Sequence, residues 1–447
     1  MSDALIVVGG GLAGAEAAWQ AAERGASVTL YEMRPTRTTP AHQTDLLAEL
    51  VCSNSLKSAA PDTASGLLKE EMDTLGSLVL GCARETAVPA GTALAVDREA
   101  FARRVTESIS AHPRITLMRE EVRRLPDSLA IIATGPLTSD ALAAELAQVT
   151  GRKHLYFFDA LSPTFAADSL NLDVIFEGSR RDEGEGDYLN CPLTEEQYDC
   201  FYQALLTAER VRLRPFEEGA YFEACLPVEE IARRGRLSLA FGPMRPVGLV
   251  DPRTSKHPFA VVQLRAENRE RTMFSPVGFQ TSLKYPEQER VFRLIPGLEN
   301  AQFLRHGQIH RNTYLNAPVV LDESLRLRAR PHLFCAGQLV GVEGYVESCL
   351  TGLLCGINAA RTLQGREPVL PPPETMSGAL LRYLRETSPK DFQPMNANYG
   401  LLPALETADG KPVKGSKQDR RLAHRTRSLA AMQAFLDCLV PYSRLQP

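Results

Sequence analysis

The chain has 447 residues, of which 44% are hydrophobic and 23% charged, and its formal net charge is −4. This composition is that of an ordinary globular protein, and the length allows two or three domains. No apolar run approaches the length of a membrane span, which excludes a transmembrane protein. Because the chain as a whole is not basic, any nucleic-acid partner has to be held by a local basic surface.

The nine cysteines are scattered, and no two of them form a C-x-x-C pair. An odd number without such spacing predicts reduced thiols and no metal site. The N-terminus leads directly into a predicted strand, without the charged and apolar regions of a signal peptide. We therefore expect a cytoplasmic protein.

A glycine fingerprint opens the chain. It follows an apolar strand pattern at residues 4–8 and precedes a helical pattern at residues 15–24. Gly9 permits the turn, Gly11 lets a pyrophosphate approach the backbone, and Gly14 lets the helix pack closely on the strand. A second apolar run ends at Glu32, roughly 20 residues on, where a carboxylate takes a ribose hydroxyl. The predicted dinucleotide-binding residues here are Gly9, Gly10, Gly11, Leu12, Ala13, Gly14, Glu32, Met33 and Arg34.

Two further apolar strands end in glycine, at Gly135 and at Gly337. In flavoproteins of the glutathione-reductase type, such strands return to the first sheet beside the dinucleotide. The second is followed by a predicted helix at residues 349–363. A strand that ends in glycine before a helix start places more backbone N–H groups against a flavin. These strands add Gly135, Gly337, Gln338, Gly344 and Tyr345 to the expected cofactor site. No second fingerprint follows a strand, so we expect FAD to be the bound dinucleotide and no separate nicotinamide domain.

The predicted fold class is α/β, a Rossmann-like FAD-binding domain of the glutathione-reductase type with an inserted smaller α/β domain. The amino-acid composition becomes charged and rich in Gly, Pro and Arg from about residue 178 to about 300. We expect the FAD-binding domain at 1–184 and 301–447, and the inserted domain at 185–300. Apolar spacing also predicts a helix over 66–80, and Asp97 is a plausible N-cap for a helix over 98–110.

Several segments together carry a resemblance to a known family. They are residues 9–14, 32–35, 52–57, 188–192, 221–227, 241–249, 292–298 and 337–348. The chain resembles the folate- and FAD-dependent tRNA (uracil-54, C5)-methyltransferases, smaller relatives of the GidA-type wobble-uridine enzymes. The resemblance implies that the protein makes 5-methyluridine in the T-loop of tRNA. It also implies methylenetetrahydrofolate as carbon donor, reduced flavin as carrier, and NADH or NADPH as electron source.

Such chemistry requires a reactive cysteine, because uracil C5 is a poor nucleophile until a thiolate adds at C6. Cys52 lies in a polar loop near Lys57, and Cys225 is followed by several arginines. Both match positions of the family, which implies that Cys225 attacks C6 and Cys52 assists near the flavin, although spacing alone does not settle which thiol does which. We interpret Cys191 as a turn residue. The other cysteines are interpreted as core residues: Cys82, Cys200, Cys335, Cys349, Cys355 and Cys438.

Folate needs a flat slot and polar groups for the pterin edge. The candidate residues are His306, His310, Asn312, Glu343 and Tyr345. His310 or Tyr345 is a candidate to stack on the ring, whereas the strand that carries His306 to Asn312 is equally consistent with a solvated edge. Glu343 suits either a pterin or a helix N-terminus.

Two basic clusters are candidate tRNA contacts, since phosphates supply most non-specific affinity. They contain Arg233, Arg234, Lys414, Lys417, Arg420, Arg421 and Arg425. The alternative is a solvated charged face. The target base is expected to flip out of its tertiary pairing.

Three other functions compete with this interpretation. A GidA-like enzyme of the wobble uridine is disfavoured because the chain lacks the long helical C-terminal extension. A flavin oxidoreductase of a small metabolite is disfavoured by the basic C-terminal stretch and by the pair Cys52 and Cys225. A non-catalytic flavin-binding scaffold is disfavoured by the polar run at 306–316. The oligomeric state is left open.

Overall fold

The structure is a computed structural model that describes residues 4–39, 41–151, 155–180, 187–211, 226–406, 413 and 415–439. Within this part, the side chains at 155–160 and 309–313 are also outside the description. Cys225 and Lys414, two of the predicted site residues, therefore lie outside the described residues. For His310 and Asn312 only the strand that carries them is described.

A six-stranded sheet forms the centre of the larger domain, in the order β16-β17-β7-β1-β2-β6. All neighbours pair in parallel except β16 and β17. The strands are β1 (Ala4–Val8), β2 (Ser27–Tyr31), β6 (Ile115–Met118), β7 (Ala130–Ile132), β16 (Arg326–Leu327) and β17 (Arg330–Cys335). The three glycine-ended strands predicted from the sequence, β1, β7 and β17, lie side by side. Their carboxyl ends therefore meet at one edge of the sheet.

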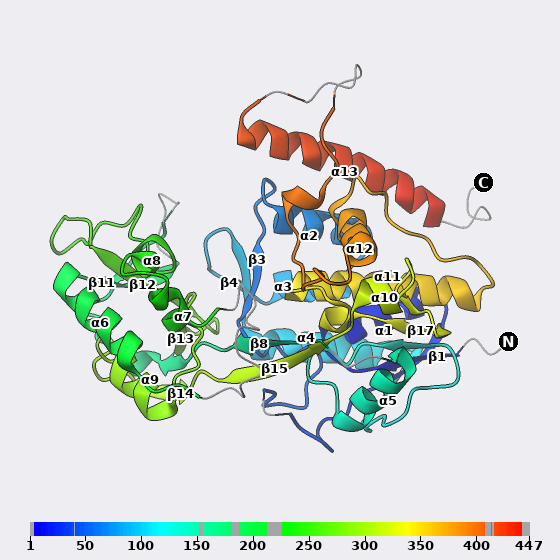
Figure 1. Ribbon diagram of the computed structural model, residues 1–447, viewed down its shortest axis with the longest axis horizontal. Helices are drawn as coiled ribbons and strands as arrows, with labels where there is room; N and C mark the ends of the chain where they lie inside the picture. The colour runs from blue at the N-terminus through cyan, green and yellow to red at the C-terminus, as the bar shows by residue number, and fades with distance from the viewer. Residues whose placement is uncertain are drawn as a thin grey trace.

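Helices cover this sheet and form one core with it (Figure 1). They are α1 (Leu12–Glu23), α2 (Ala64–Thr74), α3 (Leu78–Glu85), α4 (Arg98–Ala111), α5 (Asp140–Thr150), α10 (Ala317–Val320), α11 (Tyr345–Leu363), α12 (Met376–Glu386) and α13 (Lys417–Leu439). The helices α1 and α11 approach so closely that a Cβ on Gly352 would lie 2.1 Å from the Ala13 carbonyl oxygen. Small residues at this crossing bring both helix N-termini to the edge where the strands end.

A second body contains another six-stranded sheet, in the order β10-β11-β12-β13-β9-β14, and every neighbouring pair is antiparallel. Its strands are β9 (Thr164–Ala166), β10 (Phe176–Glu177), β11 (Tyr188–Leu193), β12 (Ala260–Ala266), β13 (Met273–Pro276) and β14 (Phe303–Arg305). Its helices are α6 (Glu195–Thr207), α7 (Val228–Arg233), α8 (Ser238–Phe241) and α9 (Tyr285–Phe292). They pack a separate core. The body occupies the left of Figure 1.

This sheet extends past the expected insertion of 185–300 on both sides, because β9 and β10 precede residue 185 and β14 follows residue 300. The change in composition near residue 178 falls between β10 and β11, inside the second body. We propose boundaries near residues 161 and 305 instead. There the two-stranded ribbon of β8 (Leu155–Ala160) and β15 (Ile309–Tyr314) links the bodies (Figure 1).

A small sheet of β3 (Ser55–Ser58), β5 (Ala93–Val96) and β4 (Ala87–Val88) lies between the two bodies (Figure 1). Short 3-10 turns occur at η1 (Ala167–Ser169), η3 (Gly337–Val340) and η4 (Tyr399–Leu401). No helix in the described part of the chain is long and apolar enough to cross a bilayer.

The local predictions are mostly confirmed. Asp97 caps α4 by accepting from the Ala100 N–H. The single helix expected over 66–80 is wrong, because Gly76 adopts φ +74° and separates α2 from α3.

The assignments of the cysteines are confirmed for Cys82, Cys335, Cys349 and Cys355, which are buried. Cys200 and Cys438 are exposed, so their assignment to the core is wrong. Cys191 lies in the middle of β11 and is fully buried, so it is not a turn residue.

Candidate active site at the glycine-ended strands

A groove runs along the edge where β1, β7 and β17 end. The segments that line it come from every part of the predicted cofactor site and from the chain around it: residues 8–13, 31–34, 133–139, 337–338, Thr39, His42, Glu49, Val51, 120–122, Leu142, Tyr345 and Ser348. The structure thus brings the glycine fingerprint, Glu32, Gly135 and Gly337 together.

The glycines of the fingerprint have distinct geometric roles. Gly9 has φ +103°, and a Cβ there would lie 2.5 Å from the Ala133 carbonyl oxygen. A Cβ on Gly14 would lie 1.7 Å from the Gly9 carbonyl oxygen. Gly11, in contrast, has no protein atom within 4 Å of the position of a Cβ. Gly11 is also the N-cap of α1, whose first N–H groups have no intrahelical acceptor. This open, anion-favouring cradle fits the pyrophosphate of FAD.

Glu32 lies beside this cradle. Its Oε2 accepts from the Gly10 N–H at 2.9 Å, and its Oε1 accepts from Arg34 Nε at 2.9 Å. Burial raises the pKa of Glu32, but the bonds and charge of Arg34 outweigh burial and hold the pKa below its ordinary value. Glu32 is therefore an ionised acceptor, which is what a ribose hydroxyl requires.

The opposite wall is formed by η3 and α11. The Gly337 N–H donates to Thr351 Oγ1 at 2.7 Å, and Gly337 and Gly344 have φ of +79° and +117°. The helix predicted to begin at Cys349 begins at Tyr345, so Tyr345 and Glu347 lie in its first turn. A helix N-terminus therefore faces the groove on this wall as well.

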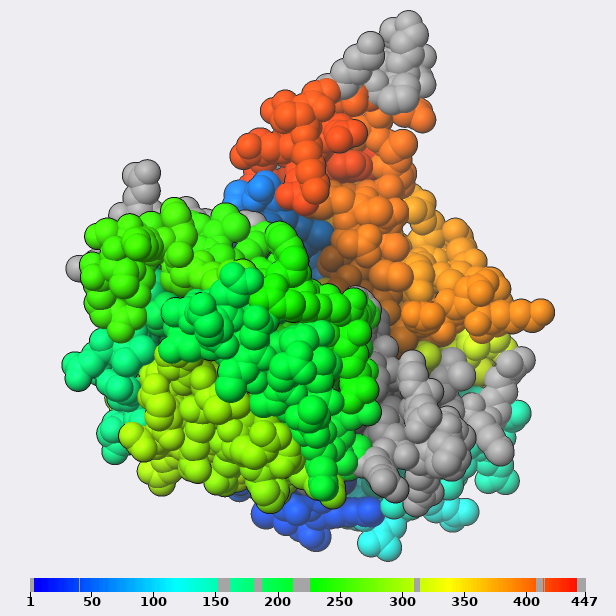
Figure 2. Space-filling view, turned by 60° about the vertical axis from the view of Figure 1, so that its left-hand side comes forward, coloured from blue at the N-terminus to red at the C-terminus, as the bar shows by residue number. Residues whose placement is uncertain are grey.

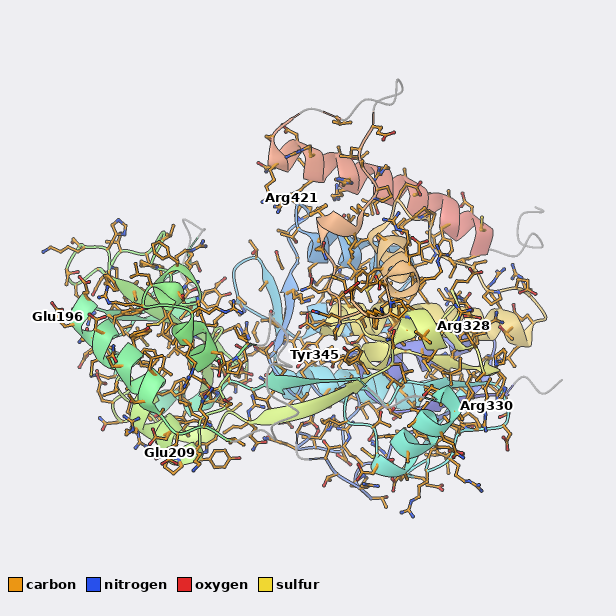
Figure 3. All side chains as sticks on the ribbon, viewed as in Figure 1. Glu196, Glu209, Arg328, Arg330, Tyr345 and Arg421 are labelled. Carbon is orange, nitrogen blue, oxygen red and sulfur yellow. The ribbon has the colours of Figure 1, made fainter. Side chains whose placement is uncertain are left out.

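Cys52 is adjacent to two residues that line the groove, Val51 in the chain and Tyr345 through a hydrogen bond. The Cys52 N–H donates to Tyr345 Oη at 2.7 Å, and the Ser53 N–H donates to the same oxygen at 3.2 Å. Tyr345 lies near the middle of the molecule, where the two bodies approach (Figure 3). The buried thiols are less reactive, since burial raises the pKa of Cys82 to about 11 and that of Cys335 to about 12.

Lys57, the cation that the sequence singled out near Cys52, is bound by Glu347 Oε1 at 3.0 Å and by the Glu343 carbonyl oxygen at 3.4 Å. The structure adds three cations that the sequence did not suggest. The guanidinium groups of Arg98, Arg265 and Arg305 all interact electrostatically with Cys52.

Arg98 also holds the Cys52 loop in place. It donates to the Leu50 carbonyl oxygen at 2.6 Å and to the Cys52 carbonyl oxygen at 3.4 Å, and it pairs with Glu267, the residue after β12. The buried Asn54 donates to the Ala266 carbonyl oxygen at 2.9 Å. The Cys52 loop is therefore fixed by residues of both bodies. Sequence reasoning missed these residues, because no local pattern distinguishes them from other arginines and glutamates.

The folate candidates are dispersed. Glu343 and Tyr345 flank the start of α11, and Glu343 is buried. His306 lies in the second body, where it contacts Glu289 at 3.2 Å and stacks on Tyr285 with ring centroids 4.6 Å apart. The structure does not bring His306 to the groove. The strand β15 ends beside η3, since the Leu315 N–H donates to the Leu339 carbonyl oxygen at 2.8 Å.

The tRNA candidates fall into two places. Arg233 and Arg234 are exposed at the end of α7 in the second body. Lys417, Arg420, Arg421 and Arg425 lie on the first turns of α13. Figure 2 shows the second body and α13 on one face of the molecule. Lys417 and Arg420 are exposed, whereas Arg421 lies over the Tyr399 ring and Arg425 pairs with Glu70 at 2.6 Å.

The parallel sheet, the glycine cradle and Glu32 define a dinucleotide-binding protein of the glutathione-reductase type with an inserted antiparallel domain. Comparison with known proteins identifies the family. The model of the family described as "Glucose inhibited division protein A" matches residues 4–367. The chain belongs to this family and, within it, to the methylenetetrahydrofolate--tRNA-(uracil-5-)-methyltransferases.

The relatives that carry this name match almost the whole chain. The TrmFO of Desulforudis audaxviator is 56% identical over 98% of this chain and 99% of its own length. That of Moorella thermoacetica is 58% identical over 91% of this chain and 93% of its own length. Among solved structures, GidA of Aquifex aeolicus has a TM-score of 0.69 at 16% identity, covering 98% of this chain and 76% of that one. The last likeness confirms the predicted fold.

Proposed function

We propose that the protein methylates C5 of uridine 54 in the T-loop of tRNA, with methylenetetrahydrofolate as carbon donor. The proposal rests on one observation: the Cys52 N–H donates at 2.7 Å to Oη of Tyr345, a residue that lines the dinucleotide groove. The names of its relatives supply the reaction class.

FAD is the cofactor that this groove fits. The Gly9–Gly14 turn and the α1 N-terminus would hold the pyrophosphate, and Glu32 would take the ribose. The N-terminus of α11 and Gly337 would face the flavin ring. The chemistry that bound FAD supplies is electron transfer and carriage of the one-carbon unit. NADH or NADPH as reductant is part of this proposal.

The cysteines activate the base. In the proposal Cys225 adds as a thiolate to uracil C6, and the electron pair of the C5–C6 bond moves toward C5 and the C4 carbonyl oxygen, which makes C5 nucleophilic. Cys52 then assists removal of the proton from C5. The positive charge of Arg98, Arg265 and Arg305 stabilises negative charge that develops on the base near Cys52.

The exposed basic residues of the surface suit RNA as a partner. Arg233 and Arg234 at the end of α7, and Lys417 and Arg420 at the start of α13, are exposed. We propose that they contact tRNA phosphates. The cytoplasmic location also remains a proposal. It is supported by the eight cysteines of the described residues, all of which are free.

One assay tests the function. Flavin-loaded protein is incubated with unmodified tRNA, NADH and methylenetetrahydrofolate labelled in the methylene carbon, and the digested nucleosides are analysed by mass spectrometry. We expect labelled 5-methyluridine, and none with a tRNA that carries cytidine at position 54. Label at the wobble uridine, or none in any nucleoside, would contradict the proposal.

Cysteine variants test the mechanism. Cys52→Ala and Cys225→Ala are expected to reduce product to background while flavin stays bound. Cys200→Ala is the matched control, because Cys200 is an exposed thiol on α6 away from the groove. Full activity of Cys225→Ala would remove it as the nucleophile.

A further inference from the structure

Residues 41–52 form an irregular segment that ends at Cys52. All of it is described, and it contains no helix or strand, so contacts with its surroundings have to set its position. Three of its residues, His42, Glu49 and Val51, line the cofactor groove. The segment therefore lies against the predicted dinucleotide site along part of its length, and it carries the predicted catalytic thiol at its end.

Glu49 closes this segment on itself. Its Oε1 accepts from the Gln43 N–H at 2.8 Å, and its Oε2 accepts from the Thr44 N–H at 3.1 Å and from Thr44 Oγ1 at 2.8 Å. The Glu49 side chain is only 12% exposed. One carboxylate, three positions before Cys52, therefore fixes the start of the segment.

The same carboxylate is tied to the predicted ribose acceptor through Arg34. Arg34 Nη1 donates to Glu49 Oε2 at 3.1 Å, and Arg34 Nε donates to Glu32 Oε1 at 2.9 Å. The Arg34 side chain is 2% exposed, so one buried guanidinium serves two carboxylates. Because the two acidic groups share one cation, further hydrogen-bond donors on Glu32 stabilise the whole network. The hydroxyls of a ribose are such donors.

A strained turn attaches the segment to the glycine fingerprint. Ala48 has φ +53°, a left-handed conformation that is unfavourable for a residue with a Cβ. The Ala48 N–H donates to the Gly10 carbonyl oxygen at 2.9 Å, and the Gly10 N–H donates to Glu32 Oε2 at 2.9 Å. Strain of this kind persists only where the surrounding contacts enforce it. The turn at Ala48 therefore depends on the same groups that face a bound nucleotide.

We propose that residues 41–52 couple binding of the adenosine diphosphate unit of FAD to the placement of the Cys52 thiol, with Glu49 as the positioning residue. Ribose hydroxyls on Glu32 strengthen its network with Arg34 and Glu49, which holds the strained turn in place. Without the nucleotide the turn relaxes and the Cys52 loop loosens. By linkage, the contacts that order the segment also tighten nucleotide binding. The proposal rests on the proposed function, because it takes FAD as the cofactor and Cys52 as the catalytic thiol.

Adenosine diphosphate is the probe that tests the coupling. It carries the ribose and the pyrophosphate but no flavin ring that would cover Cys52 directly. The full-length protein, stripped of flavin, is treated with iodoacetamide with and without saturating adenosine diphosphate, and peptide mass spectrometry measures the alkylation rate of Cys52. The exposed Cys200 reports the activity of the reagent in the same sample. We expect the nucleotide to slow alkylation of Cys52 at least threefold and to leave that of Cys200 unchanged.

Two substitutions separate the coupling from a general loss of an ion pair. Glu49→Gln keeps the shape of the side chain and removes the charge that binds Arg34. Asp322→Asn is the matched control, since Asp322 likewise accepts from Ser324 and Arg326 of its own loop and is 21% exposed. Asp322 lies outside the lining of the groove. The Kd of adenosine diphosphate is measured for each protein by equilibrium dialysis.

The outcomes decide as follows from the role of Glu49. We expect its variant to raise the Kd of adenosine diphosphate about threefold to tenfold and, at saturation, to abolish protection of Cys52. We expect Asp322→Asn to match the wild type in both measurements. Equal protection of Cys52 in Glu49→Gln overturns the proposal. So does a wild-type protein that does not bind the nucleotide, or that binds it without protecting Cys52.

A second measurement applies if thermal unfolding shows that a stripped protein is not folded. Hydrogen–deuterium exchange is then compared between the flavin-loaded wild type and flavin-loaded Glu49→Gln. Faster exchange of the Cys52 and Ser53 amides, which donate to Tyr345, supports the coupling. No change, or a change confined to residues 43–46, overturns it. Neither measurement requires turnover, so failure of the proposed function and failure of the coupling are distinguishable.

Discussion

Tyr345 and Cys52 are joined by a hydrogen bond across 293 positions of the chain, from the Cys52 N–H to Tyr345 Oη at 2.7 Å. The same oxygen accepts from the Ser53 N–H at 3.2 Å. Burial and the nearby Cys52 raise the pKa of Tyr345, so its O–H keeps its proton at neutral pH. The first turn of α11 therefore fixes the loop that carries the thiol.

Tyr345→Phe is expected to release this loop. Two part-buried backbone N–H groups lose their acceptor. A loss of roughly 1–3 kcal/mol that falls on the reaction barrier corresponds to a fall in kcat for 5-methyluridine formation of about fivefold to about 150-fold. Alkylation of Cys52 by iodoacetamide, followed by peptide mass spectrometry, reports the release directly. Tyr383→Phe is the control, since the Tyr383 hydroxyl donates to the Gln393 carbonyl oxygen away from the site. Identical alkylation of Cys52 in both variants would contradict the role of Tyr345.

Replacement by alanine is expected to have different effects at two glycines of the fingerprint. Gly11→Ala introduces a methyl group that meets no protein atom within 4 Å but enters the groove, so the protein should fold normally and lose FAD. Gly14→Ala places a Cβ 1.7 Å from the Gly9 carbonyl oxygen, so it should destabilise the fold itself. Flavin absorbance and the urea midpoint of the apoprotein separate the two effects. A Gly11→Ala protein with full flavin content would show that this cradle does not hold the pyrophosphate.

The glycine fingerprint was predictable from the sequence, whereas the surroundings of Cys52 were not. Gly9, Gly11 and Gly14 lie within one strand–turn–helix unit, and their spacing alone encodes the geometry. The environment of Cys52 depends instead on Arg265 and Glu267, more than 200 positions away, and on which body β12 joins. Single-sequence patterns carry no such distances.

Cys191 also shows that a local sequence pattern does not determine where a residue lies in the fold. The proline after it suggested a turn, yet Pro192 pairs with Val261 inside the second sheet. Tertiary packing, which buries this strand completely around Cys191, overrides the local preference. The polar loop and the nearby Lys57 made Cys52 a candidate among nine cysteines, and the resemblance to a family strengthened that prediction.

The cations of α13 are not equivalent, and tRNA binding should distinguish them. Lys417 and Arg420 are exposed, whereas Arg425 is paired with Glu70 at 2.6 Å. Replacing Lys417 and Arg420 together by alanine should weaken tRNA binding and make the slope of log K against log salt shallower by roughly one to two. Arg425→Ala should change that slope less. Filter binding at several salt concentrations measures both, and equal slopes in the wild type and the double variant would exclude this helix from the interface.

A buried lysine makes stability depend on pH. Lys69 is 2% exposed, and its Nζ donates to the Ser58 carbonyl oxygen at 2.8 Å and to Ser65 Oγ at 2.7 Å, both uncharged acceptors. Burial lowers its pKa to about 7, against the attraction of Glu347 and with the repulsion of Lys57. Below this pKa both the folded and the unfolded chain are protonated, and the folded chain bears the full cost of a buried charge.

As pH rises from about 7 toward the ordinary pKa of lysine, the folded chain loses the proton while the unfolded chain keeps it. The free energy of unfolding therefore rises with pH in this window, by about 1.4 kcal/mol per unit at most. Lys69→Met lacks this dependence. We expect the stability advantage of Lys69→Met over the wild type, measured by urea unfolding with saturating FAD, to shrink by ~2 kcal/mol between pH 7 and 9. Lys284→Met, at an exposed lysine paired with Glu209, should show no such change. A constant difference for Lys69→Met would mean that Lys69 stays protonated in the folded protein, because only loss of that proton relieves the buried charge.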